Sequence, residues 1–387
     1  DFVTAAADLG LDLVVASEAG HTLAEQGGGF LEVDCRDPEA AAETIADYHR
    51  RHPLDAVVAA DDQGVVVAAL AAERIGLPHN PPASARATRD KAVMRELLEA
   101  AGVPQPRWAL LEVGAAGGSP VGYPCVVKPL DLSGSRGVIR ADGLRELEQA
   151  VARIRAILAE AGRPADAALL VEEYVPGAEV AVEGLLGPGG LEVLAVLDKP
   201  DPLEGPFFEE TIFQTPSRLG TDREQLVVDV VGRAVEALGL AFGPVHAEVR
   251  IDGDTAVVIE VAARSIGGLC GRSLRFGLLG TTLEHLLLRA AVGLPRRGMR
   301  REQRASGVMM LPIPAEGFLR GIRWKEAALE VPGITALEIT IPVGEWVRPL
   351  PEGDRYLGFL FAAGEDPDDV EASLREAHGL LDVQISP

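Results

Sequence analysis

The chain has 387 residues, which is enough for two or three domains with a substantial core. Its net charge of −23, from 59 acidic and 36 basic residues, argues against nucleic acid and anionic membranes as partners. No apolar run reaches the length of a membrane span and no basic, apolar leader opens the chain, so we expect a cytoplasmic protein.

Residues 1–85 are predicted to form an N-terminal αβ domain with a parallel sheet. Alternating strand and helix patterns support this, at 11–17, 38–51, 54–60 and 63–75. The chain opens on DFVTAAADLG, which is typical of a helix already under way, so we expect the first strand of this domain to be missing. The Pro-rich stretch at 77–85 predicts a domain junction.

Residues 86–298 are predicted to form a second domain, with a smaller lid subdomain at about 108–175. Thr88 is expected to cap its first helix, and one apolar face of this helix would carry Val93, Leu97, Leu98 and Ala101. Further strands and two amphipathic helices are predicted at 123–129, 143–161, 168–175, 178–186, 191–199 and 222–238.

Residues 299–387 are predicted to form a C-terminal α+β domain. Apolar strand patterns occur in VMMLPIPA, ALEITIPV, LGFLFAAG and LLDVQIS, with a helix near 367–379. The chain is therefore expected to combine α/β and α+β parts.

The glycine-bearing loop SGSRG joins two predicted strands, so it is neither a Walker A loop nor a Rossmann turn, both of which open a helix. Its backbone N–H groups can bind phosphate oxygens, and Lys128, just upstream, would add a point charge. The candidate phosphate ligands are Ser133, Gly134, Ser135 and Gly137. A flexible hairpin tip is the alternative interpretation.

Three carboxylates, Glu172, Glu173 and Glu179, flank a Pro-Gly turn. In a nucleobase pocket, backbone groups near Tyr174 and Val175 would pair with the adenine edge, and Glu179 would accept hydrogen bonds from ribose hydroxyls. The alternative is that one of the consecutive carboxylates simply faces solvent.

A hairpin of two apolar strands, VHAEVRI and AVVIEVA, carries the most informative acids. A three-residue loop would put Glu248 directly opposite Glu260, whereas a two-residue loop would put the two side chains on opposite faces. Facing carboxylates repel unless a cation or a proton lies between them, and paired hard oxygen ligands suit Mg²⁺. The alternative is a solvated sheet face on which Arg250 and Arg264 compensate the charge.

Taken in order, these motifs resemble the ATP-grasp superfamily, and within it the carboxylate–amine ligases of the L-amino acid ligase type. The resemblance covers most of the chain and implies an ATP-grasp fold with a central antiparallel sheet. It rests on Lys91, Lys128, SGSRG, VEEYVPGAE, HAEVRI, IEVAARSIGG and PEGDRYLGFLFA.

The resemblance also implies a nucleotide site. In ATP-grasp enzymes, two lysines at the positions of Lys91 and Lys128 hold the phosphates of ATP, and a glycine-rich lid loop closes over them. Lys199 is similar in position to a further phosphate contact. The adenosine contacts implied are Glu172, Glu173, Tyr174, Val175 and Glu179.

Glu248 and Glu260 match the carboxylates that hold Mg²⁺ in the family, where Mn²⁺ can replace it. Arg264 matches an arginine that stabilises the phosphorylated intermediate or the substrate carboxylate. The sequence departs from the family at Ala262, where many members have an asparagine that supplies a ligand to the second Mg²⁺. This departure puts the second metal position in question.

The chemistry implied is ATP-dependent ligation of a small-molecule carboxylate to an amine, through an acyl phosphate and with amino acids as the expected substrates. Glu209 and Glu210 could face the substrate's amino group or lie in a solvated loop. The alternatives are an ATP-grasp carboxylase, another acyl-phosphate ligase, or a catalytically silent nucleotide-binding module. Because homodimers are common among such proteins, a homodimer is the assembly to test.

Overall fold

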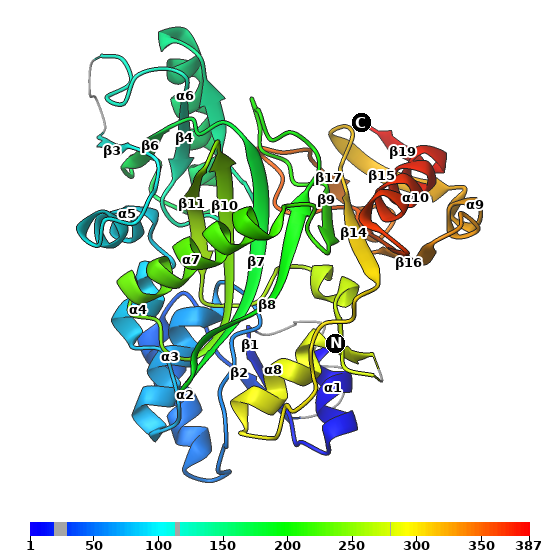
Figure 1. Ribbon diagram of the computed structural model, residues 1–387. Coiled ribbons are helices and arrows are strands. Elements are labelled where there is room, and N and C mark those ends of the chain that lie inside the picture. Colours follow the sequence, from blue (N-terminus) through cyan, green and yellow to red (C-terminus); the bar gives the residue numbers. More distant parts are fainter. Residues whose placement is uncertain (19–28, 113–116, 279) are drawn as a thin grey trace.

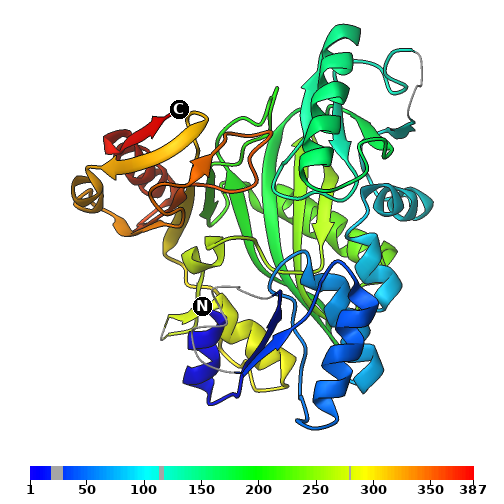
Figure 2. The ribbon, with the colours of Figure 1, turned by 180° about the vertical axis from the view of Figure 1, so that it is seen from behind.

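The computed structural model describes residues 1–18, 29–112, 117–278 and 280–387. Three lobes surround a long central sheet (Figure 1). Seen from behind in Figure 2, the C-terminal lobe lies beside this sheet, and the N-terminal lobe and a small upper sheet lie toward its two ends. Of the helices in the described ranges, none is long and apolar enough to cross a membrane.

The N-terminal lobe has two parallel strands, in which Val14 pairs with Gly29. Its elements are α1 (Phe2–Leu9), β1 (Val14–Ser17), β2 (Gly29–Glu32), α2 (Pro38–His49) and α3 (Gly64–Ile75). The strand predicted at 54–60 is wrong, because this segment pairs with no described strand. Its apolar residues Leu54 and Val57 instead pack into the core between α2 and α3.

The Pro-rich junction leads into two helices, α4 (Pro82–Ala87) and α5 (Lys91–Ala100). The predicted cap is wrong, because the Asp90 side chain accepts hydrogen bonds from the first turn of α5, whereas Thr88 ends α4. The predicted apolar face is not the buried one at Val93 and Leu97, which are exposed. A face containing two buried cations, Lys91 and Arg95, turns inward instead.

The small sheet, called the lid here, has the strand order β3-β6-β4-β5. Its strands are β3 (Trp108–Leu111), β4 (Cys125–Pro129), β5 (Ile139–Ala141) and β6 (Leu169–Glu173). The amphipathic helix α6 (Leu144–Glu160) buries Leu147, Ile154 and Leu158 against it. This packing fixes the positions of Lys128, at the end of β4, and Glu172, on β6.

The central sheet has eight antiparallel strands in the order β11-β10-β7-β8-β9-β14-β18-β16. Their bounds are β7 (Ala178–Gly187), β8 (Gly190–Lys199), β9 (Ile212–Thr215), β10 (Gly243–Asp252), β11 (Thr255–Ala262), β14 (Ala305–Leu311), β16 (Ile334–Ile339) and β18 (Gly358–Gly364). Helix α7 (Thr221–Ala237) covers one face through Val227 and Val231. The opposite face of β10 carries polar side chains toward a cavity.

The remaining elements belong partly to the C-terminal lobe and partly to a region whose helix α8 (Leu283–Ala291) packs against α1. They are η2 (Cys270–Ser273), β12 (Arg275–Phe276), β13 (Thr281–Thr282), α8 (Leu283–Ala291), β15 (Gly317–Arg323), α9 (Lys325–Leu329), β17 (Trp346–Val347), α10 (Pro367–Leu380) and β19 (Asp382–Ser386). Because β14 pairs with β9 and β18, the sheet continues from the central part into the C-terminal lobe. The domain boundaries drawn from the sequence stay predictions.

Candidate active site

A cavity of about 660 Å³ lies where the lid, the central sheet and the C-terminal lobe meet, which is a volume typical of small-molecule sites. All the predicted site residues line it except two. Gly137, the last residue of the lid loop, lies close to Pro129 outside the lining, and Lys199 lies just behind the lining, bonded to cavity carboxylates. The structure therefore gathers most of the predicted site residues around one cavity, and their roles stay predictions.

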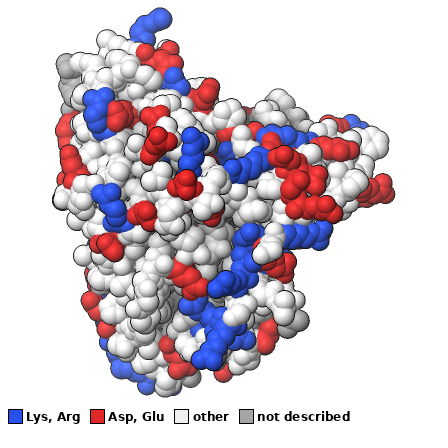
Figure 3. All heavy atoms as spheres, viewed as in Figure 1, with Lys and Arg blue, Asp and Glu red and all other residues white. Residues whose placement is uncertain are grey.

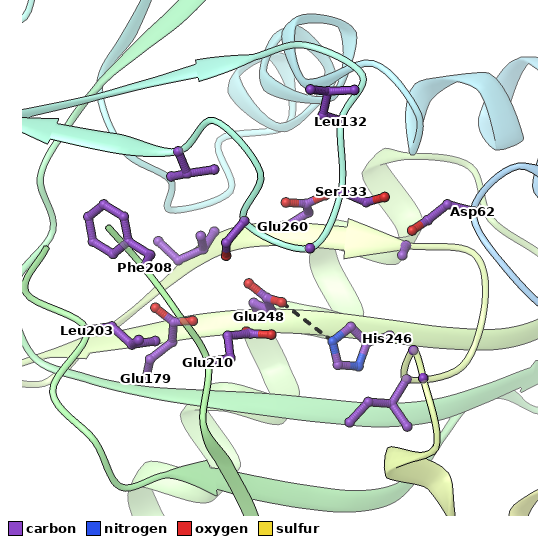
Figure 4. A pocket seen from close by; sticks show the side chains of 18 of the residues that line it. Asp62, Leu132, Ser133, Glu179, Leu203, Phe208, Glu210, His246, Glu248 and Glu260 are labelled. Atoms are coloured by element: carbon purple, nitrogen blue, oxygen red, sulfur yellow. Dashed lines mark ion pairs between the residues drawn. The ribbon is translucent and has the colours of Figure 1, made fainter. Parts of the chain in front are cut away.

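The hairpin places Glu248 directly opposite Glu260, as a three-residue loop would have done, but by another route. Asp252 pairs with Thr255, so the loop has only two residues, and a β-bulge then shifts the register at Ile259. One extra residue on β11 reverses the alternation, which returns both carboxylates to the cavity face. Figure 4 shows the two side chains on neighbouring strands.

Arg95 holds this bulge from behind, and sequence reasoning missed it. Its guanidinium donates to the carbonyl oxygens of Val258 (3.2 Å) and Ile259 (2.6 Å), the two residues at the register shift. It also pairs with Glu172 at 2.6 Å, although its side chain is almost fully buried. Its spacing of four residues from Lys91, one helical turn, was the signal available in the sequence.

Lys128 and Glu172 form a buried ion pair at 2.6 Å on adjacent lid strands. Burial lowers the pKa of Lys128, and Glu172 only partly offsets this effect. Burial would raise the pKa of Glu172, but Arg95 and Lys128 outweigh it and hold that pKa below its ordinary value. The carboxylate thus stays ionised and fixes the lysine at the cavity wall.

Lys91 opens α5 and reaches the same wall. Its ammonium lies 3.3 Å from Glu260 and donates to the carbonyl oxygen of Leu132 at 2.7 Å. The adjacent lid loop has left-handed backbone at Gly134 and Ser135. The amide N–H groups of 133–135 donate to no acceptor within the described ranges, so they are available to a phosphate.

Four charged groups cluster on the floor of the cavity. Lys199 bonds Glu179 at 2.6 Å, bonds Glu210 directly and lies 3.5 Å from Glu248. Burial raises the pKa of Glu210 to about 7, whereas Lys199 and His246 outweigh burial at Glu248 and hold its pKa well below the ordinary value. Sequence reasoning favoured a solvated loop for Glu210, whereas the structure leaves its side chain only 16% exposed and bonded to Lys199.

His246 is a charged structural partner rather than a free ligand. Its Nδ1 bonds Glu183 at 2.5 Å, and Glu183 also accepts the backbone N–H of Ile266. Burial disfavours the imidazolium, but Glu183 outweighs this effect and raises the pKa of His246 to about 9. The charged ring lies 3.6 Å from Glu248, as the dashed line in Figure 4 marks.

Arg264 follows β11 and points to the N-terminal lobe. It pairs with Asp62 at 2.9 Å, and Asp62 also pairs with Arg89 at 3.0 Å. The two arginines outweigh burial and lower the pKa of Asp62. Asp62 carried no sequence motif, because it meets Arg264 only through the tertiary fold.

Most of the residues implied as adenosine contacts already bond or contact other side chains of the protein. Glu179 accepts bonds from Lys199 and from Arg250, which lies 2.7 Å away, and Arg250 also bonds the carbonyl of Val175. Glu173 pairs with Arg107 at the rim. The ring of Tyr174 packs against the Arg250 guanidinium. A ribose hydroxyl at Glu179 would share its oxygens with two cations.

A C-terminal segment, residues 348–356 and called the strap here, lies against the lid. The Gly137 amide donates to the Pro351 carbonyl at 3.1 Å. Ion pairs join Arg153 to Glu352, Arg136 to Asp354 and Arg348 to Glu160. Asp354, Arg355 and Tyr356 of the strap also line the cavity.

The donor set fits a divalent cation of the Mg²⁺ type. Glu248 and Glu260 present carboxylate oxygens on one face, and Glu179, Glu210 and Glu248 offer oxygens within 4.8 Å of one another. Lys91 and Lys199 hold these acids in place. Ala262 pairs with His246 and contributes no donor atom.

Comparison with known proteins finds matches along most of the chain. Residues 3–79 match the ATP-grasp N-terminal domain and residues 121–273 match the ATP-grasp domain. Residues 309–386 match the L-amino acid ligase C-terminal domain 2. These three matches confirm the resemblance and the fold class drawn from the motifs.

The crystal structure of L-amino acid ligase from Bacillus licheniformis is similar, with a TM-score of 0.83 and 25% identity, covering 100% of this chain and 95% of that one. Carnosine synthase 1 of Gallus gallus is 30% identical over 82% of this chain and 37% of its own length. Alanine–anticapsin ligase of Bacillus subtilis is 28% identical over 59% of this chain and 52% of its own length. The chain spans 37% to 64% of the curated relatives it matches first. The chain belongs to the ATP-grasp superfamily, with an L-amino acid ligase type of C-terminal domain.

Proposed function

We propose that this chain is an ATP-dependent carboxylate–amine ligase that joins amino acids through an acyl phosphate, releasing ADP and phosphate. The observation that carries the proposal is the Glu248–Glu260 pair, which lies in one cavity with Lys91, Lys128 and Arg264. The similarity to L-amino acid ligase, carnosine synthase and alanine–anticapsin ligase supports the same chemistry.

The reaction has two steps. The substrate carboxylate attacks the γ-phosphate of ATP, which breaks the bond to ADP and gives an acyl phosphate. The amine then attacks the acyl carbon, and phosphate leaves as the amide forms. The protein acts chiefly by positioning these groups and neutralising their charge.

The residues of the chain divide this work. Lys91 and Lys128 hold the phosphates, and Arg264 screens the charge that develops at the reacting carboxylate. Glu210, with a pKa of about 7, is suited to take the proton that the attacking amine loses. Mg²⁺ held by Glu248 and Glu260 would supply further neutralisation of the phosphates, and Mn²⁺ can serve in its place.

A screen of amino acid pairs for ADP and phosphate release, with mass spectrometry of the products, tests the proposal. We expect ADP release to require both an amino acid carboxylate and an amine, with a condensed product of matching mass. ADP release that depends on bicarbonate would instead indicate a carboxylase. ATP binding without turnover across the panel would indicate a silent module. The cytoplasmic location and the homodimer stay predictions of the sequence.

A further inference from the structure

A second cavity, called the arginine pocket here, lies apart from the candidate active site. Its volume is about 220 Å³. Arginines line it from η2, from β12 and from the segment before β14, namely Arg272, Arg275, Arg301 and Arg304. Figure 3 shows blue side chains gathered where α8 and the segment leading to β14 lie. The floor is apolar, from Ala305, Phe361 and Ala362.

Three of these arginines have no acidic partner in the part of the chain that the structure describes. Among the described residues, no carboxylate lies within ion-pair distance of Arg275, Arg301 or Arg304, whereas Arg272 pairs with Asp1 and Glu338. Arg275 donates instead to the backbone carbonyls of Arg272 and Leu274. Arg301 and Arg304 each make one backbone bond, at 3.4 Å.

This arrangement is unexpected in a chain with a net charge of −23, in which acids are abundant. Like charges held around one cavity repel, and the cost rises where water is excluded. Burial lowers the pKa of Arg301, and the neighbouring Glu224 and Glu302 only partly offset this effect. The lining contains one acid, Glu302, against four arginines, so its net charge is positive.

The chemistry of the walls selects an oxyanion. A guanidinium presents paired N–H donors that match two oxygens of a phosphate or carboxylate. Ser306 and Thr335 add hydroxyl groups to the same walls. The volume equals about seven water molecules at roughly 30 Å³ each, which accommodates a phosphate or a pyrophosphate. We propose that the arginine pocket binds a small phosphate-class anion, either free or as the phosphoryl group of a small metabolite.

The segment 267–275 is one of the elements that connect the arginine pocket to the candidate active site. Gly267, Gly268 and Cys270 line the active-site cavity, and Arg272 and Arg275 line the arginine pocket. Within η2, the Ser273 hydroxyl donates to the Cys270 carbonyl at 2.8 Å, which links the two ends of this turn. An anion bound to Arg272 and Arg275 would therefore contact the same segment that lines the active-site cavity.

Calorimetric titration of the metal-free protein with inorganic phosphate, pyrophosphate and ribose 5-phosphate tests the proposal. The variant Arg301→Met/Arg304→Met removes two guanidinium groups from the pocket. The matched control, Arg297→Met/Arg300→Met, removes the same charge from the same segment outside the lining. Thermal unfolding of both variants checks that they fold, and each titration is repeated with saturating ADP.

We expect the pocket variant to weaken anion binding by about tenfold or more, and the control variant to bind within about twofold of the unsubstituted protein. Equal weakening in both variants would show diffuse charge rather than a built site. Loss of binding in the presence of ADP would place the anion in the candidate active site, and no binding at millimolar anion would also overturn the proposal. Tighter binding of ribose 5-phosphate than of phosphate identifies a phosphorylated metabolite as the source, and the reverse order identifies the free anion.

The inference goes beyond the proposed function, and its binding test does not need ligase activity. Where the proposed ligase activity is found, we expect saturating anion to lower the KM for the amino acid substrates with little change in kcat. A silent nucleotide-binding module would still bind the anion in the arginine pocket. The two proposals therefore fail separately.

Discussion

Replacing Arg95 with lysine tests whether the bulge in β11 is what positions Glu260. A lysine keeps the positive charge beside Glu172, but its single ammonium cannot also reach the carbonyls of Val258 and Ile259 as the guanidinium does. Hydrogen bonds to a charged group contribute about 1.5–3 kcal/mol each. Because two such bonds are lost, we expect the free energy of unfolding to fall by about 3–6 kcal/mol.

Lysine is preferable to an apolar replacement at this position. Removing one partner of a buried ion pair costs about 3–5 kcal/mol, and the lost carbonyl bonds would add to this. The total would approach the whole stability of a typical domain, about 5–15 kcal/mol. Arg95→Met would then report unfolding, whereas Arg95→Lys keeps the Glu172 pair and isolates the carbonyl contacts.

The assay is the Mg²⁺ dependence of ATP-driven turnover, with Mn²⁺ binding to the ADP-bound protein measured by electron paramagnetic resonance. Loss of a group that supports a metal ligand costs about 10–100-fold in metal affinity, so we expect the half-saturating metal concentration to rise by that factor. Arg107→Lys is the matched control, because Arg107 pairs with the rim carboxylate of Glu173, and it should change stability by less than about 1 kcal/mol. A destabilised Arg95→Lys with unchanged metal dependence would refute the reasoning.

Three further outcomes follow from the site. Glu260→Gln should lower turnover by about 100-fold or more with an unchanged circular dichroism spectrum, and near-normal activity would contradict the metal assignment. The raised pKa of Glu210, about 7, means that its contribution to stability is complete below its ordinary pKa of 4.5 and is lost as pH rises through 7. Glu210→Gln should therefore flatten the fall in unfolding free energy between pH 5 and 7, and parallel urea-denaturation curves would refute this. His246, with a pKa of about 9, contributes stability that is complete below pH 6.5 and lost through pH 9, so His246→Gln should flatten that second window in the same measurement.

Alternation and composition predicted most strands of the lid and the central sheet, because buried strands leave a local apolar signal. They predicted no strand at β3, and they predicted a loop at 200–216, where β9 lies. The two-residue loop shows the limit of that reasoning. A one-residue bulge restores the side-chain register, yet Ile259 looks like any strand residue. The side chain that holds the bulge, Arg95, lies 164 residues away in the sequence. The strand predicted at 54–60 fails for a related reason, since an apolar run does not specify whether a partner strand lies beside it.

Lys128 and the two hairpin carboxylates could be found because charged groups in apolar strands are unusual, and Lys91 could be found through the family resemblance. The side chains that pair with the site residues could not be predicted from the sequence. Asp62 meets Arg264 across more than half the chain, and Glu183 meets His246 between two strands of the central sheet. Glu210 occupies a loop whose burial depends on how that loop packs over Lys199. These contacts are made by the tertiary fold, and no local pattern records them.

The strap makes the motion of the lid a property of two lobes at once. Lid opening must separate Gly137 from Pro351 and break three ion pairs at the surface. Exposed ion pairs contribute about 0–1 kcal/mol each and weaken with salt. Higher ionic strength should therefore lower the free energy needed to separate the lid from the strap. Because the strap also lines the cavity, the C-terminal lobe and the lid meet at the wall of the candidate active site.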